Sequence, residues 1–246
     1  MSSTLTATEM KPFTPGLRDG VVYVWEGRLD ATPTATTSAR TLLSERELAR
    51  ADRFVYDRHR RRYTVAQAHL RRALGRLMGV PPQRIRFSHG KHGKPYLGDG
   101  PSFNQSHSGE RIMIAVANEG RLGVDIEKVR TVRLMAELAE KQFARDEVAL
   151  FRATRARGRQ AMFFRLWTLK EAFTKALGVG LTIPLSSFSV DPAHSATNGL
   201  VRIDGHNEDP AEWLVAGLPC AAGAKAAFAI DRPGITVAPL PFNVGG

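Results

Sequence analysis

Secondary-structure signals follow the same order in both halves of this 246-residue chain: a strand, then helices, then further strands. Runs of β-branched and aromatic residues predict the strands, and apolar residues three or four apart predict the helices. No residue-by-residue repeat accompanies this order, so the order alone suggests an internal duplication. The expected strands are 21–25, 85–87, 112–117, 122–126, 188–190, 213–216 and 226–230, and the expected helices include 63–77, 132–143, 147–153 and 162–177.

Short polar signals mark where some of these elements begin and end. Ser44 and Glu47 fit a capping box, in which each side chain satisfies a free backbone N–H of the other residue, so a helix is expected to begin there. Gly79 fits the C-cap of the helix that follows. The stretch 30–39, rich in Thr, Ala and Ser, predicts a loop.

An excess of positive charge narrows the choice of partners. Lys and Arg number 35 against 24 Asp and Glu, which gives a net charge of +11 and a pI near 10.4. This surplus favours an anionic partner: nucleic acid, a membrane surface, a phosphorylated ligand or an acidic protein. Cys220 is the only cysteine, so an intramolecular disulfide is excluded. The chain shows neither a secretory signal nor the ~20 apolar residues of a spanning helix, and we expect a cytoplasmic protein.

Three carboxylates form the first chemical candidate. Residues two apart on a strand face the same side, so Asp125 and Glu127 are expected to point together. Glu171 lies on an expected helix, four residues before Lys175. Three carboxylates suit a hard cation such as Mg²⁺. A solvated strand end and a surface Glu171–Lys175 salt bridge are the alternatives that these residues leave open.

Further polar groups lie upstream of these carboxylates. Lys94 stands in a loop between Gly93 and Pro95, and Ser106 and His107 stand among other small polar residues. Either motif could bind a phosphate or belong to an ordinary turn. Nine arginines between residues 50 and 76 suit phosphate or nucleic-acid binding, although a solvated helix face explains most of such a run.

Taken in order, these motifs closely resemble those of the 4'-phosphopantetheinyl transferases of the larger, surfactin-synthetase-activating (Sfp) type. The resemblance covers the chain from about residue 50 to about residue 190. It implies transfer of the phosphopantetheine arm of coenzyme A to a serine hydroxyl of an apo acyl or peptidyl carrier protein, with release of 3',5'-ADP. The matching segments are 93–95 (GKP), 103–108 (FNQSHS), 123–128 (GVDIEK), 167–175 (WTLKEAFTK), 178–181 (GVGL) and 188–190 (FSV).

The resemblance also implies roles for the acidic residues and for one lysine. Asp125, Glu127 and Glu171 would hold Mg²⁺, or Mn²⁺ in its place. Glu171 and Lys175 would be the catalytic residues, with Glu171 as the candidate base for the carrier serine and Lys175 at the pyrophosphate. Glu147 stands where relatives carry an acid of debated role.

Basic and polar residues would bind coenzyme A in this family. The implied contacts to its phosphates and adenosine come from Lys94, Ser106 and His107, with His107 at the 3'-phosphate. Arg50 and Arg53 fall near the place where the family has basic residues for the same phosphate. Glu47 occupies a nearby position where a lysine can occur, so this part of the site is expected to differ.

The fold implied by the resemblance is α+β, a pseudodimer of two similar α/β halves with the active site in the cleft between them. Residues 1–119 would contact coenzyme A, and residues 120–246 would carry the metal ligands and the catalytic helix. The expected protein is a monomer that binds coenzyme A and carrier proteins, and neither nucleic acid nor a membrane. A basic nucleic-acid-binding regulator and a non-catalytic coenzyme A-binding protein of the same fold are the alternatives.

Overall fold

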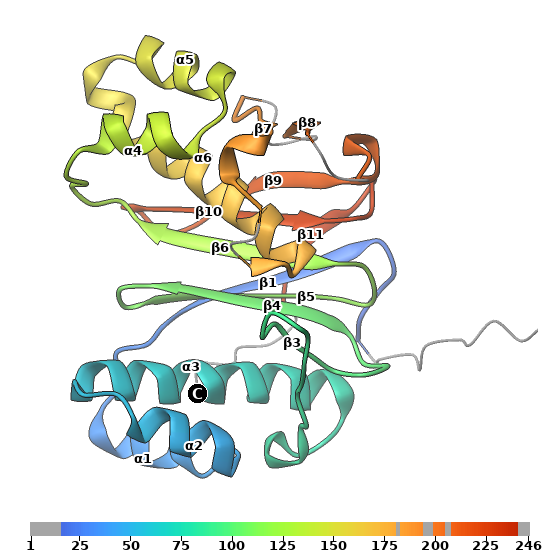
Figure 1. Ribbon diagram of the computed structural model, residues 1–246. Helices are drawn as coiled ribbons and strands as arrows, with labels where there is room; N and C mark the ends of the chain where they lie inside the picture. Colours follow the sequence, from blue (N-terminus) through green and yellow to red (C-terminus); the bar gives the residue numbers. More distant parts are fainter. Residues whose placement is uncertain (1–15, 181–182, 194–198, 205–207, 241–246) are drawn as a thin grey trace, which may run out of the picture.

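Two β-sheets lie face to face at the centre of the molecule, and a long helix covers the outer face of each (Figure 1). The computed structural model describes residues 16–180, 183–193, 199–204 and 208–240. Helix α3 (Asp57–Met78) packs on one sheet and helix α6 (Ala156–Leu177) on the other, which gives four layers. No helix within the described ranges is long and apolar enough to cross a membrane.

The first sheet has the strand order β11-β1-β5-β4. Strands β1 and β4 both pair antiparallel with β5, and β11 (Thr236–Pro239), from the far end of the chain, pairs parallel with β1. The elements of the first half are β1 (Val21–Arg28), α1 (Pro33–Arg40), α2 (Glu45–Asp52), α3, β2 (Ser88–His89), β3 (Pro95–Tyr96), β4 (Ser102–Ser108) and β5 (Arg111–Ala117).

The second sheet has the order β6-β10-β9, and β6 and β9 both pair antiparallel with β10. Strands β7 and β8 form a separate pair beside it. The elements of the second half are β6 (Leu122–Lys128), α4 (Met135–Gln142), α5 (Arg145–Ala153), α6, β7 (Phe188–Val190), β8 (Leu200–Ile203), β9 (Leu214–Leu218) and β10 (Ala224–Ile230).

The two halves repeat one order of elements: a strand, three helices, a short antiparallel strand pair and two further strands. Helices α3 and α6 have 22 residues each, and each ends at a glycine in the left-handed region. These glycines are Gly79, with a φ of 66°, and Gly178, with a φ of 70°. The expected α+β pseudodimer of two similar halves is therefore confirmed.

Strand β6 separates apolar from acidic side chains on its two faces. Val124 and Ile126 are fully buried between the sheets, where they pack with Met113 of β5. Because successive strand residues point to opposite faces, Asp125 and Glu127 leave β6 on the other side. Burial of the alternate apolar residues thus fixes which way both carboxylates point.

The expected loop over 30–39 is wrong, because residues 33–40 form helix α1. The Thr32 side chain accepts a hydrogen bond from the backbone N–H of Ala35 and caps the helix. Pro33 follows in the first turn, where the missing N–H has no partner to lose. A proline in this position marks the start of a helix and not a break.

The ordinary turn that was one alternative for 103–108 does not form, because this segment lies within strand β4. Asn104, Ser106 and Ser108 point to one face of the strand, and Phe103, on the other face, is buried against the outer helix. The expected strand over 85–87 is displaced, since β2 begins at Ser88. The capping box of Ser44 and Glu47 is confirmed.

Gly123 lets helix α6 lie directly against β6. A Cβ atom at this position would lie 2.1 Å from the carbonyl oxygen of Ala172 and 2.4 Å from the backbone nitrogen of Ala176. Gly123→Ala should therefore push the helix away and lower the free energy of unfolding by roughly 1–3 kcal/mol, measured by urea denaturation. Gly90→Ala is the control, because its nearest neighbour would be 3.7 Å away. Equal stability of the two variants would contradict this packing.

Candidate functional site

A row of polar side chains on β4 joins the first half to β6 of the second half. Asn104, Ser106 and Ser108 alternate along β4, so they share one face of it. We call their contacts with β6 the β4–β6 seam. Its bonds join Asn104 Oδ1 to Val124 N (2.9 Å), Ser106 Oγ to Asp125 Oδ1 (2.7 Å), Ser108 Oγ to Glu127 Oε2 (2.6 Å) and Ser108 Oγ to Lys128 N (3.1 Å).

Asp125 is the buried centre of the site, with 3% of its surface exposed. Its Oδ1 accepts hydrogen bonds from Ser106 Oγ and, at 2.5 Å, from the ammonium of Lys175 on α6. Lys175 Nζ also donates to Ser106 Oγ at 2.8 Å. Burial raises the pKa of Asp125 even though the Lys175 charge opposes that rise. Its second oxygen, Oδ2, is buried without a hydrogen-bond partner among the described residues.

Glu171 lies one helical turn before Lys175 and is half-buried. Partial burial raises its pKa, and the negative charges of Asp125 and Glu127 raise it further. Within the described part of the chain, its carboxylate has no hydrogen-bond or ion-pair partner. Glu127 is better satisfied, because it accepts from Ser108 and forms an ion pair with Arg130 at 2.9 Å. The three carboxylates are thus close enough to influence one another electrostatically.

The chemistry of these donors fits a hard divalent cation, although they do not form a closed cage. No group of three His, Cys, Asp or Glu side chains in the described ranges is close enough to hold a metal ion. However, Asp125 Oδ2 and the Glu171 carboxylate both lack a partner among the residues that the structure describes, and carboxylate oxygens are the ligands that Mg²⁺ prefers. The cationic partner that the structure shows for Asp125 is the Lys175 ammonium.

The residues expected to bind coenzyme A come from β4, from the end of α2 and from the loop before β3. His107 follows Ser106 on β4, and partial loss of water, with the charge of Lys175, lowers its pKa. Arg50 and Arg53 are exposed at the end of α2, and neither forms a described hydrogen bond or ion pair with the seam. The Arg50 guanidinium instead lies over the ring of Tyr63.

Lys94 lies in the loop before β3, and its side chain crosses to the second half. Its ammonium donates to the backbone oxygens of Leu122 at 2.8 Å, Lys175 at 2.7 Å and Ala176 at 3.1 Å. Its expected contact with coenzyme A stays a prediction.

Sequence reasoning did not identify the partners of Glu147. This buried carboxylate accepts hydrogen bonds from Lys170 Nζ at 2.6 and 2.7 Å, from Val190 N and from Ala144 N. Lys170 Nζ also donates to the carbonyl oxygen of Phe188 at 2.6 Å. We call the Glu147–Lys170 pair the second-half staple, because it joins α5, α6 and β7.

The first half contains an equivalent pair. Glu47 accepts from Ser44 N and from the guanidinium of Arg71, which is buried and also bonds to the carbonyl oxygens of residues 82 and 85. Glu47 and Glu147 are each the third residue of their helices, and Arg71 and Lys170 are each the fifteenth. Glu47 is thus buried in a contact with Arg71 that joins α2 and α3. The equivalence shows that Glu147 has a structural contact of the same kind as Glu47.

Comparisons with known proteins show the family of this chain. The family model for the 4'-phosphopantetheinyl transferase N-terminal region matches residues 29–119, and the 4'-phosphopantetheinyl transferase superfamily model matches residues 121–228. The chain is 38% identical over 176 residues to the 4'-phosphopantetheinyl transferase HetI of Nostoc sp., a match that covers 70% of this chain and 74% of HetI. It therefore belongs to the 4'-phosphopantetheinyl transferase superfamily, which confirms the predicted family and enzyme class.

Two further relatives carry the same activity in their names. The 4'-phosphopantetheinyl transferase Sfp of Bacillus subtilis is 32% identical over 61% of this chain and 66% of Sfp. The 4'-phosphopantetheinyl transferase gsp of Aneurinibacillus migulanus is 32% identical over 52% of this chain and 53% of gsp. The match to gsp thus spans about half the length of that relative. These names favour an enzyme over the nucleic-acid-binding alternative.

The second-half staple should contribute strongly to stability. Glu147→Gln removes the counter-charge of the buried Lys170 ammonium, so the free energy of unfolding should fall by about 3–5 kcal/mol. Glu140→Gln, which breaks an exposed ion pair with Arg152, is the matched control and should cost less than about 1 kcal/mol. Denaturant unfolding of both variants checks this. A Glu147→Gln protein as stable as the control would show that the pair contributes little.

Proposed function

We propose that this protein transfers the 4'-phosphopantetheine group of coenzyme A to a serine hydroxyl of an apo acyl or peptidyl carrier protein. The observation that carries the proposal is the contact of Lys175, Asp125 and Ser106, which brings an ammonium, a carboxylate and a hydroxyl from two halves to one point. A negatively charged pyrophosphate with a divalent cation is a ligand that such a mixed site suits. Membership of the superfamily supports the same reaction.

In this reaction, the serine oxygen of the carrier forms a bond to the phosphorus of the phosphopantetheine group. The bond from that phosphorus to the bridging oxygen breaks, and 3',5'-ADP leaves with the electron pair. Lys175 would stabilise the charge that develops on the phosphate oxygens. Glu171 has a raised pKa and a carboxylate without a partner in the described part of the chain, and it is the candidate acceptor for the serine proton.

The three carboxylates of the site would hold the divalent cation that the family implies. Asp125, Glu127 and Glu171 are the proposed ligands of Mg²⁺, or of Mn²⁺, and the unpartnered Oδ2 of Asp125 supports this set. When bound, the cation would supply Lewis-acid stabilisation of the phosphate oxygens. Lys175 would then remain beside Ser106, where its second hydrogen bond already lies.

Coenzyme A would bind between the halves. Ser106 and His107 are the proposed phosphate contacts from the first half, with His107 at the 3'-phosphate. Arg50 and Arg53 are proposed for the same phosphate, and their exposure leaves both guanidinium groups accessible. We also propose residues 1–119 and 120–246 as the functional halves, neither of which holds all of these groups.

Intact-mass spectrometry of apo carrier proteins tests the proposed function. With enzyme, coenzyme A and Mg²⁺, a carrier should gain the phosphopantetheine mass, and chelation of the metal should stop the gain. Glu171→Gln should fold normally and lose roughly 10²–10⁴-fold in turnover, because it removes the candidate base and a proposed metal ligand. Glu137→Gln, at an exposed position on α4, is the control. Near-normal turnover of Glu171→Gln would contradict the proposed role of Glu171. The absence of a mass gain with every carrier tested would contradict the proposed transferase function.

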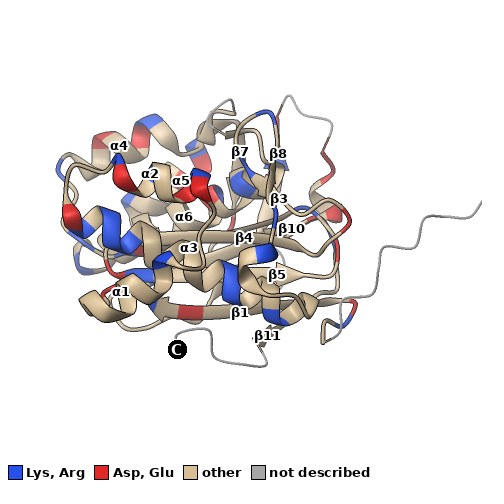
Figure 2. Cartoon of the chain, turned by 90° about the horizontal axis from the view of Figure 1, so that it is seen from below, with Lys and Arg blue, Asp and Glu red and all other residues tan. Residues whose placement is uncertain are grey.

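Exposed basic side chains should speed the encounter with an acidic carrier. Lys and Arg recur along α3 (Figure 2), and the whole chain has a net charge of +11. Salt screens exposed charges over roughly 10 Å at 0.1 M, so the KM for the carrier should rise with ionic strength. Steady-state kinetics across a salt series, with sucrose as an uncharged control, measures this. A carrier KM independent of salt would mean that the surplus charge has another purpose.

A further inference from the structure

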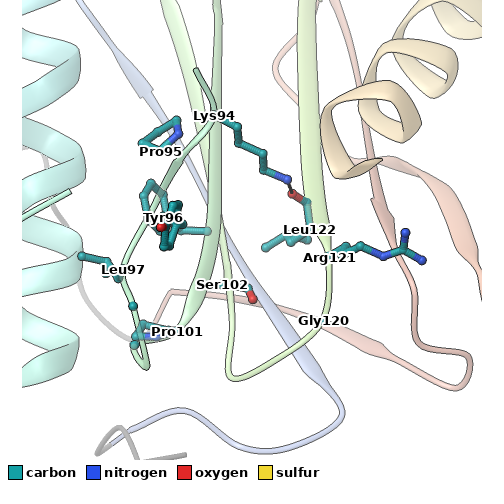
Figure 3. Close-up of a pocket in the computed structure, with 12 residues that line it drawn as sticks. Lys94, Pro95, Tyr96, Leu97, Pro101, Ser102, Gly120, Arg121 and Leu122 are labelled. Carbon is teal, nitrogen blue, oxygen red and sulfur yellow. Dashed lines mark hydrogen bonds between the residues drawn. The ribbon is translucent and has the colours of Figure 1, made fainter. Parts of the chain in front are cut away.

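Lys94 connects the two halves at the C-terminal end of helix α6. It stands in the first half, at the rim of a pocket that Arg121 and Leu122 of the second half also line (Figure 3). In that view its side chain extends toward Leu122, where the ammonium meets the backbone oxygen at 2.8 Å. The other two acceptors are the carbonyl oxygens of Lys175 and Ala176, in the last turn of α6.

The end of α6 is a favourable place for a cation. The last four carbonyl groups of a helix have no partner within the helix, and the helix dipole places partial negative charge there. Lys94 satisfies two of these carbonyls and one at the start of β6. Because an ammonium has three N–H donors, all three are used, and none remains for a phosphate.

The backbone at Gly178 accommodates this contact. Gly178 caps α6 in the left-handed conformation, with a φ of 70°, and a Cβ atom there would lie 3.2 Å from Lys94 Cδ. The aliphatic stem of Lys94 therefore passes close to the helix cap, where a larger side chain would crowd it. Burial, with the charge of Arg121, lowers the pKa of Lys94 to about 8, so its ammonium depends on these carbonyls for stabilisation.

We propose that Lys94 is a positioning residue that fixes the end of α6, and thereby Lys175, and that it is not a phosphate ligand. It holds the backbone oxygen of Lys175 at 2.7 Å, while the side chain of Lys175 reaches Asp125 and Ser106. The first half thus controls a catalytic side chain of the second half through its main chain. We call the three hydrogen bonds of Lys94 the Lys94 clamp. The expected effect on turnover rests on the proposed function, whereas the clamp itself does not.

Lys94→Met tests the proposal, because it keeps the aliphatic stem and removes all three donors. The melting temperature should fall by about 4–8 °C, from loss of bonds to a charged donor. The kcat, measured well below that temperature, should fall roughly 10–100-fold, because Lys175 is displaced. The Kd for coenzyme A, from calorimetry, should stay within about threefold. Lys91→Met, in the same loop and exposed, is the matched control.

A second variant keeps the test decisive if Lys94→Met does not fold. Lys94→Gln retains two N–H donors and no charge, so it should keep part of the kcat and an unchanged Kd for coenzyme A. A Kd weakened tenfold or more, with melting temperature and kcat unchanged, would instead identify Lys94 as a phosphate ligand and overturn the proposal. A lower melting temperature with normal kcat would also overturn it, since the role would be purely structural. If the wild-type protein transfers nothing, the function fails, while melting and binding still test the clamp.

Discussion

The β4–β6 seam is the contact on which the site depends. Its serine and asparagine side chains take the place of a backbone ladder between strands from different halves. These bonds bring Asp125 and Glu127 to the boundary, and packing of α6 against Gly123 brings Glu171 and Lys175 over them. A buried polar network of this kind is stabilising only when its members are satisfied. Within the described ranges, Asp125 Oδ2 is the member without a partner, and we propose that a divalent cation binds there.

Two similar halves share one scaffold but only one set of reactive groups. Each half has its own buried carboxylate–cation pair at equivalent positions, which stabilises the long helix. The chemistry differs because the side chains on that scaffold differ. Leu29 N after β1 and Val129 N after β6 donate to equivalent carbonyl oxygens, so Trp25 and Gly27 are equivalent to Asp125 and Glu127. Arg72 and Glu171 are each the sixteenth residue of their long helix, so these two are also equivalent. The first half therefore lacks the acidic set and contributes polar groups from β4.

Local chemistry explains which features could be predicted from the sequence. The cap at Ser44 and the glycine ends of α3 and α6 depend on neighbouring residues, so the sequence alone indicates them. Strand β4 was missed because the partners of Ser106 and Ser108 are polar groups of a distant strand, and no apolar alternation marks that face. The three acceptors of Lys94 are backbone atoms about 28 to 82 positions away, which no motif encodes.

The return of β11 to β1 has a consequence for how the chain is made. The first sheet gains its edge strand only from residues 236–239, after nearly all of the second half has left the ribosome. Until then β1 presents unpaired backbone groups on that side, which invites pairing with another chain. The first half of this protein can assemble most of its core early during synthesis. Its sheet, however, is completed only when residues 236–239 pair with β1, after the strands of the second sheet have been made.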